Sequence, residues 1–130
     1  MGTSNSESFS LGRRAQSMRF AWRGLVAVAR SQHNARIHGC VTVAVVVAGL
    51  LSRLHAGEWA LMAFAVAGVW AAEAFNTAIE ALGDAVSPGD HPLVGMAKDA
   101  AAGGVLVTVA GAVAVGLLVL VPRALQALAR

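Results

Sequence analysis

The sequence predicts an all-α integral membrane protein with one N-terminal amphipathic surface helix and three transmembrane helices. Of its 130 residues, 57% are hydrophobic and only 13% are charged, and the mean hydropathy is +0.65. Soluble domains carry about 25% charged residues. A chain of this length forms one domain whose interior is too small to bury so much apolar surface, so lipid is the expected solvent.

The distribution of basic residues indicates a membrane surface rather than a nucleic-acid partner. The formal net charge is +3, and six of the ten Lys and Arg residues precede the first apolar stretch: Arg13, Arg14, Arg19, Arg23, Arg30 and Arg36. Such a segment faces anionic head groups on the cytoplasmic side. No nucleic-acid-binding motif accompanies it. The single cysteine, Cys40, excludes an intramolecular disulfide, and no secretory signal peptide is expected.

The elements follow in order. Residues 1–10 are polar and are predicted to be disordered, and the single membrane domain is expected over residues 11–123. Within it, residues 11–31 mix arginines with apolar residues and contain no proline. This pattern predicts an amphipathic helix that lies on the membrane, with Trp22 at the interface.

Three stretches are predicted to cross the membrane: residues 34–53, 58–86 and 91–121. The first has 16 residues without Lys, Arg, Asp or Glu, from Ile37 to Ser52, and reaches the required length of about 20 if Arg36 snorkels. The third has 22 such residues, from Ala100 to Val121. Pro122 and Arg123 are expected to end it and to leave a short tail, residues 124–130.

The segment between the second and third spans is a predicted turn. Pro88-Gly89 favours the turn, Asp90 is the expected N-cap of the next helix, and Pro92 suits its first turn. The excess of arginines before the first span places the amino terminus and this turn in the cytoplasm and the carboxyl terminus outside. The third span repeats small residues every four positions, which predicts close helix packing in an oligomer: Ala100, Gly104, Thr108, Ala112 and Gly116.

Polar residues form one narrow stripe on the second span: Glu73, Asn76, Glu80 and Asp84. At about 100° per residue all four share one face of the helix. An ionisable residue at mid-bilayer costs about 2.5–3.5 kcal/mol on insertion scales. Water, metal ions, positive partners or a substrate that needs a base must offset this cost. The sequence therefore predicts an active site at the membrane surface.

The predicted topology brings this stripe to the cytoplasmic face together with Lys98, Asp99 and the arginines. Carboxylates and an amide suit Mg²⁺, and the cationic side chains suit a polyphosphate. A deeply placed carboxylate suits a general base toward a lipid hydroxyl. These are the parts of phosphoryl transfer, although no Walker-type loop is present. A hypothesis from another class is a non-catalytic oligomeric helix bundle whose stripe lines a cation or proton pathway.

The pattern Glu73-x-x-Asn76-x-x-x-Glu80, with the later Lys98-Asp99, resembles the signature of the prokaryotic diacylglycerol kinase family, which includes the undecaprenol kinases. The similarity includes Asp84 and His91 and two earlier segments, Phe20-Ala-Trp22-Arg-Gly24-Leu25 and Asn34-Ala-Arg36-Ile-His38. It extends from about Arg13 to the end of the third span.

The resemblance implies a homotrimer of three-span subunits in the inner (cytoplasmic) membrane, with active sites shared between neighbouring subunits. It implies that ATP and Mg²⁺ are used to phosphorylate a lipid alcohol at the cytoplasmic face. Diacylglycerol is the first expected substrate. Undecaprenol is the alternative, because the segment from Asn34 to His38 is more similar to the undecaprenol-kinase branch.

Matched residue by residue, Glu73 is the expected base. The resemblance assigns lipid contacts to Glu73, Trp22, Arg36 and His38. It assigns nucleotide contacts to Arg13, Phe20, Gln32, Asn76, Glu80, Asp84, His91, Lys98 and Asp99. It also assigns the metal to Glu80 and Gln32. Gln32 stands where most members have a glutamate, so its amide oxygen can ligate but brings no charge. Phe20 replaces a frequent tyrosine and lacks its hydroxyl.

Overall fold

The computed structural model describes residues 11–31 and 33–129. The predicted disordered segment 1–10 and Gln32 lie outside the described residues, as does residue 130. The described residues form four α-helices: α1 (Leu11–Ser31), α2 (His33–Leu51), α3 (Ala56–Val86) and α4 (Pro92–Leu128). The prediction of an all-α protein with three apolar spans is confirmed, because α2, α3 and α4 are each long and apolar enough to cross a membrane.

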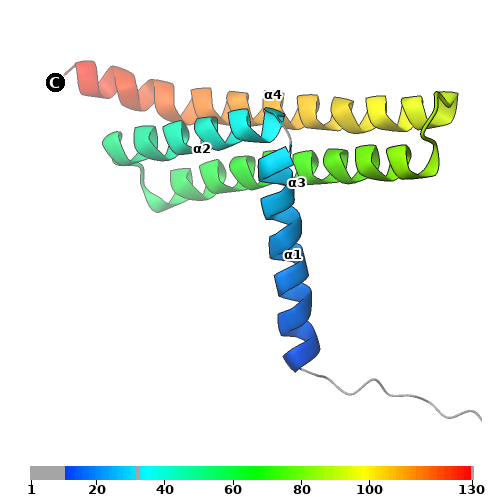
Figure 1. The fold of residues 1–130 in the computed structure, drawn as a ribbon. Helices are drawn as coiled ribbons and strands as arrows, with labels where there is room; N and C mark the ends of the chain where they lie inside the picture. Colours follow the sequence, from blue (N-terminus) through cyan, green and yellow to red (C-terminus); the bar gives the residue numbers. More distant parts are fainter. Residues whose placement is uncertain (1–10, 32, 130) are drawn as a thin grey trace, which may run out of the picture.

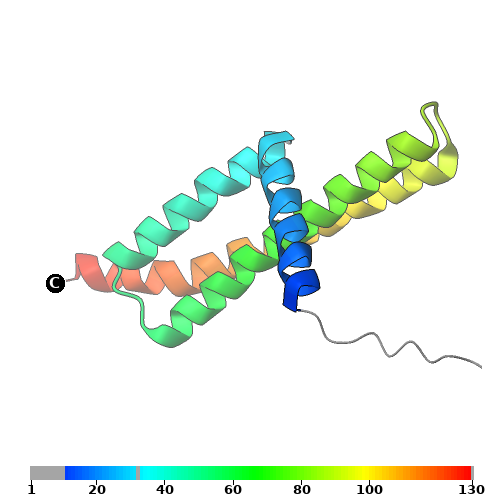
Figure 2. The same ribbon diagram turned by 60° about the horizontal axis from the view of Figure 1, so that its bottom comes forward.

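The three candidate spans lie side by side, and α1 runs across them (Figures 1 and 2). α3 and α4 pack along most of their lengths, and α1 contacts α2 and α3. The carboxyl end of α4 lies near the α2–α3 connection, and the α3–α4 turn lies at the opposite end (Figure 1). Each residue adds about 1.5 Å to a helix, so the 31 residues of α3 extend well beyond the 19 of α2. The α3–α4 turn therefore projects past α2.

The buried core is small and lies near the α2–α3 connection. Leu54, Met62 and Val119 form the buried cluster, against which Val45 and Trp59 pack. Most other large apolar side chains are exposed, among them Phe64 (83%), Phe75 (72%) and Leu118 (77%). Exposed apolar surface of this extent suits lipid or a second subunit, because hydrocarbon is the expected solvent of these helices.

α4 does not end at Pro122, so the prediction of a helix end there is wrong. The helix continues to Leu128 with Pro122 inside it. Proline removes one backbone donor, and membrane helices tolerate that loss. The next residue, Arg123, donates two hydrogen bonds to the Glu58 carboxylate in the first turn of α3, at 2.9 and 2.7 Å. This bidentate pair holds the last turns of α4 against α3.

The predicted helix cap at Asp90 is also wrong. α4 begins at Pro92, in agreement with the expected place of that proline, and its N-cap is His91. The His91 side chain accepts a hydrogen bond at Nδ1 from the backbone N–H of Leu93, at 3.3 Å. The helix starts one residue later than a cap at Asp90 requires.

Replacing Glu58 with glutamine is expected to lower the thermal unfolding midpoint of the purified protein and to leave its activity at low temperature unchanged. The reason is that the charge-assisted pair with Arg123 joins α3 to α4 at the end away from the polar stripe. The midpoint can be measured in detergent by circular dichroism. The charge-swapped variant Glu58→Arg, Arg123→Glu should recover part of the loss. Equal midpoints for wild type and Glu58→Gln would contradict this account.

Candidate active site on α3

The buried face of α3 changes from apolar to polar along one stripe. Met62 and Val69 are buried, and the same face continues into Glu73 and Asn76, which are 1% and 6% exposed. The intervals of seven, four and three residues keep all four side chains on one side of the helix. The sequence thus places a carboxyl group where packing alone would select an apolar residue. In a membrane helix such a residue marks a functional site.

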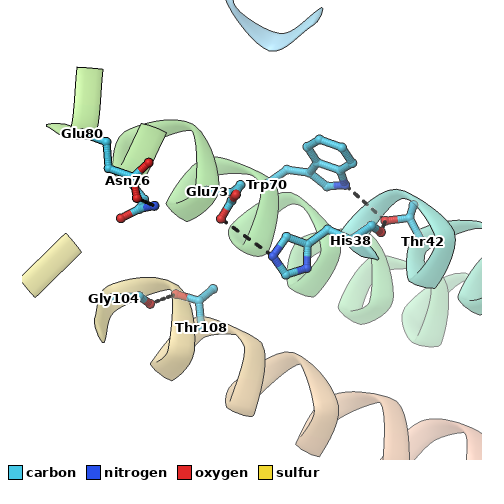
Figure 3. Close-up of polar contacts among 8 residues, drawn as sticks. All are labelled: His38, Thr42, Trp70, Glu73, Asn76, Glu80, Gly104 and Thr108. Carbon is cyan, nitrogen blue, oxygen red and sulfur yellow. Dashed lines mark hydrogen bonds and ion pairs between the residues drawn. The ribbon is translucent and has the colours of Figure 1, made fainter. Parts of the chain in front are cut away.

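Glu73 faces His38 on α2 (Figure 3). The Nε2 atom of His38 lies 3.8 Å from the Oε2 atom of Glu73, and their side chains are 15% and 1% exposed. Within the part of the chain that the structure describes, neither atom has a hydrogen-bond partner. A separation of 3.8 Å is too long for a direct hydrogen bond, but one oxygen atom between them can bond to both. The pair is therefore arranged to accept a hydroxyl group.

The next turn of α3 presents oxygen atoms suited to a hard cation. Asn76 donates from Nδ2 to Glu80 Oε1 at 2.9 Å. This bond fixes the amide, and Asn76 Oδ1 and Thr77 Oγ1 are buried with no hydrogen-bond partner among the described residues. Amide and carboxylate oxygens are ligands that Mg²⁺ accepts alongside phosphates. No group of three His, Cys, Asp or Glu side chains in the described ranges could hold a metal ion. These oxygen atoms suit an Mg²⁺ ion that a nucleotide also binds. They suit less well an ion that is held entirely by side chains of one chain.

A second polar group lies at the α3–α4 turn. Lys98 on α4 donates to Asp84 Oδ1 at 2.5 Å. Gly83 permits this close approach, because a Cβ atom there would stand 2.9 Å from Lys98 Cε and from Val94 Cγ1. A cavity of about 500 Å³ lies beside the pair and is lined by Asp84, His91 and Lys98 with residues of the turn. Three of the predicted nucleotide contacts thus surround one cavity.

The remaining predicted residues lie outside these two groups. Phe20 and Trp22 are 53% and 68% exposed on α1. Arg13 lies in the first turn of α1, and the Arg36 guanidinium donates to the carbonyl of Arg30. Asp99 is exposed in α4. Gln32 lies outside the described residues. One chain therefore brings together the stripe, His38 and Lys98, but not the full set of predicted ligands.

Two features were missed by the sequence reasoning. One is a hydrogen bond from Trp70 Nε1 to Thr42 Oγ1, at 3.1 Å, between α3 and α2. The other is an apolar cavity of about 270 Å³ between α2, α3 and α4, lined by His38, Thr42, Val69 and Gly116 among others. The spacing of these residues in the sequence could have indicated the Trp70–Thr42 contact. Thr42 follows His38 by four residues and Trp70 precedes Glu73 by three, so each pair shares a helix face.

Three apolar spans, a buried carboxylate and, further along α3, a cavity lined by a lysine are the features of a helical membrane protein with a polar site that suits a phosphorylated ligand. The model of the family described as prokaryotic diacylglycerol kinase matches residues 19–120. The chain therefore belongs to the prokaryotic diacylglycerol kinase family.

Two curated relatives agree with this assignment. The chain is 36% identical over 113 residues to the undecaprenol kinase of Bacillus subtilis, which covers 87% of this chain and 92% of that protein. It is 40% identical over 111 residues to the diacylglycerol kinase of Synechocystis sp., which covers 85% of this chain and 63% of that protein.

These similarities confirm the predicted family and class of enzyme. The protein is a lipid kinase, that is, a phosphotransferase with an alcohol group as acceptor. A kinase uses ATP, so the predicted nucleotide follows from the family. The hypothesis of a non-catalytic cation or proton pathway is correspondingly disfavoured.

Proposed function

We propose that the protein transfers the γ-phosphoryl group of ATP, with Mg²⁺, to the hydroxyl of diacylglycerol and forms phosphatidic acid at the cytoplasmic face of the inner membrane. The observation that carries the proposal is the Glu73–His38 pair, buried between apolar helices, whose facing atoms lie 3.8 Å apart and have no hydrogen-bond partner among the described residues. The family description and the 40% identical diacylglycerol kinase favour this acceptor.

Undecaprenol is the second candidate acceptor. The relative named undecaprenol kinase is matched over 92% of its length, whereas the diacylglycerol kinase is matched over 63%. His38, which faces Glu73, also belongs to the segment that resembles the undecaprenol-kinase branch. Both acceptors present one hydroxyl at the end of a hydrocarbon body, so the same pair of side chains can receive either.

In the proposed reaction the lipid hydroxyl lies between His38 Nε2 and Glu73 Oε2. Glu73 takes the hydroxyl proton while the lipid oxygen forms a bond to the γ-phosphorus. The bond from that phosphorus to the β–γ bridging oxygen breaks, and ADP leaves. Lys98 and His91 hold the phosphates at the cavity beside the α3–α4 turn. Asn76 and Glu80, with Gln32, would hold Mg²⁺, which would supply positive charge to the phosphates.

The other contacts complete the site from the surface helix and from neighbouring chains. Arg13, Phe20, Asp84 and Asp99 are proposed to contact the nucleotide, and Trp22 and Arg36 the lipid. A homotrimer with shared sites supplies the ligands that one chain does not bring together. The exposed apolar side chains support an oligomer, as do Gly104 and Gly111, where a Cβ atom would meet nothing within 4 Å.

The assignment is tested by offering diacylglycerol and undecaprenol in competition to the purified protein in bilayers with labelled ATP. The expected product is labelled phosphatidic acid. Labelled undecaprenyl phosphate in its place would reassign the substrate to the second candidate. Absence of both products would overturn the proposed function.

The apolar cavity between α2, α3 and α4 suits one hydrocarbon chain of the lipid. On α3 its lining runs from Met62 to Val69, one turn before Glu73, and on α2 it includes His38. A chain that lies there would deliver its hydroxyl end to the polar pair. We therefore assign the cavity to the substrate chain.

Replacing Gly116 with leucine is expected to raise the KM for long-chain lipid about tenfold, with the KM for ATP unchanged. Gly116 lines the cavity, and an added Cβ atom meets nothing within 4 Å, so a larger side chain has room to enter the space. Initial rates over a chain-length series measure the effect. Gly103→Leu is the matched control, since Gly103 is equally open on α4 but does not line this cavity. Equal lipid KM values for both variants would contradict the assignment.

A further inference from the structure

Two side-chain contacts join α2 to α3 on consecutive turns (Figure 3). The indole N–H of Trp70 donates to Thr42 Oγ1 at 3.1 Å, and His38 Nε2 faces Glu73 Oε2 at 3.8 Å. His38 and Thr42 are four residues apart on α2, and Trp70 and Glu73 are three apart on α3. Residues at these intervals share one helix face. The two contacts are therefore adjacent in a single interface between α2 and α3.

The Thr42 hydroxyl links Trp70 to the turn of α2 that carries His38. It accepts from Trp70 and donates to the carbonyl oxygen of His38 at 2.7 Å. A hydroxyl can do both, because it has one donor and two acceptor positions. The indole also packs on this turn, since a Cβ atom at Gly39 would stand 4.0 Å from Trp70 Cζ2. Trp70 thus holds the His38 turn by a hydrogen bond and by van der Waals contact.

Away from these two contacts, α2 packs on the core through Val45 and Gly49 near its carboxyl end. Its apolar side chains are largely exposed, including Val43 (64%), Leu50 (65%) and Leu51 (80%). Between membrane helices the hydrophobic driving force is weak, and interhelical hydrogen bonds and close packing select the register. A rotation of α2 by one residue, about 100°, would turn His38 away from Glu73.

We propose that Trp70 and Thr42 are positioning residues that fix the rotation and register of α2, so that His38 faces the Glu73 carboxylate. The proposal rests on the proposed role of Glu73 as the base. Trp70 does not line the substrate-chain cavity, although its partner Thr42 does, so the proposal predicts that the effect of Trp70 on the reaction depends on His38.

The kinetic test is a double-mutant cycle between Trp70→Phe and His38→Ala. Each single variant is expected to lower kcat about 10- to 100-fold, with the KM for ATP unchanged, because the acceptor pair loses its alignment. In the His38→Ala background, Trp70→Phe is expected to change kcat less than about twofold. Thr42→Val should lower kcat as Trp70→Phe does. Thr42→Ser keeps the hydroxyl and should retain most of the activity that Thr42→Val loses. If the kcat of the double variant falls by the product of the two single-variant losses, the proposal is overturned.

A second measurement does not depend on activity. Cysteines replace His38 and Glu73 in a Cys40→Ala background, and the rate at which a short bifunctional thiol reagent cross-links them reports how well α2 and α3 are aligned. Trp70→Phe is expected to slow this rate several-fold. Trp59→Phe is the matched control, because Trp59 packs in the core near the α2–α3 connection and should leave the rate unchanged. An unchanged rate in Trp70→Phe would overturn the positioning role, whereas failure of the proposed function would appear as an inactive wild type.

Discussion

Replacing Glu73 with glutamine is expected to abolish lipid phosphorylation and to leave the helical assembly intact. Glutamine has nearly the size and shape of glutamate, but its neutral amide cannot act as the base. General-base catalysis contributes about 10²–10⁴-fold to a rate, so kcat should fall by at least about 10²-fold, or about 2.7 kcal/mol in the activation free energy. Glu73 is 1% exposed and faces His38, and the next carboxylate of the stripe, Glu80, lies about two turns further along α3.

The measurement is the transfer of labelled phosphate from ATP to lipid by wild type and variant at saturating substrate. Size-exclusion chromatography and circular dichroism control for assembly and helix content. Glu58→Gln provides a matched control, since Glu58 lies on the same helix but pairs with Arg123 at the other end. Retention of near-wild-type labelling by Glu73→Gln would remove the base assignment.

Replacing Lys98 with methionine is expected to have the second-largest effect and to act on the nucleotide. Lys98 is the single lysine of the chain and lies beside the cavity at the α3–α4 turn. Loss of one charge-assisted phosphate contact should lower kcat/KM for ATP about 10- to 100-fold. Initial rates over a range of ATP concentrations at fixed lipid measure this change.

Two further variants separate phosphate binding from a structural role of Lys98. Asp84→Asn weakens the ion pair that Lys98 makes in the chain described here but keeps the cation. It should therefore lower kcat/KM for ATP less than Lys98→Met does. Lys98→Arg keeps the charge and should retain much of the activity. Equal losses in Lys98→Met and Asp84→Asn would contradict a phosphate contact made by Lys98 apart from its pair with Asp84.

The helices themselves were largely predictable from the sequence. The long apolar stretches follow from the cost of charge in lipid, and the start of α4 follows from Pro92, because proline is favoured in the first helical turn. The end of α4 was not predictable in the same way. Pro122 normally breaks a helix, but here Glu58, 65 residues earlier, supplies a partner for Arg123. A pairing of such long sequence separation leaves no local signal.

The site was predictable in part. Helical periodicity placed Glu73 and Asn76 on one stripe, and both are buried. Periodicity of one helix does not say what faces that stripe, so the His38–Glu73 contact depended on the packing of α2 on α3. The same limit applies to Asp84. It shares the stripe by angle, but α3 has passed the end of α2 there, and Asp84 meets Lys98 of α4 instead.

The unequal lengths of α2 and α3 are expected to make the enzyme sensitive to bilayer thickness. A hydrocarbon core of about 30 Å matches about 20 residues, so the 31 residues of α3 exceed what the bilayer can cover. In the proposed topology the surplus would carry the α3–α4 turn into water and would place Glu73 close to the head groups. In a thicker membrane, hydrophobic mismatch would draw the acidic turns toward the acyl chains or tilt the hairpin. Lipid composition would then alter phosphorylation without any change in substrate concentration.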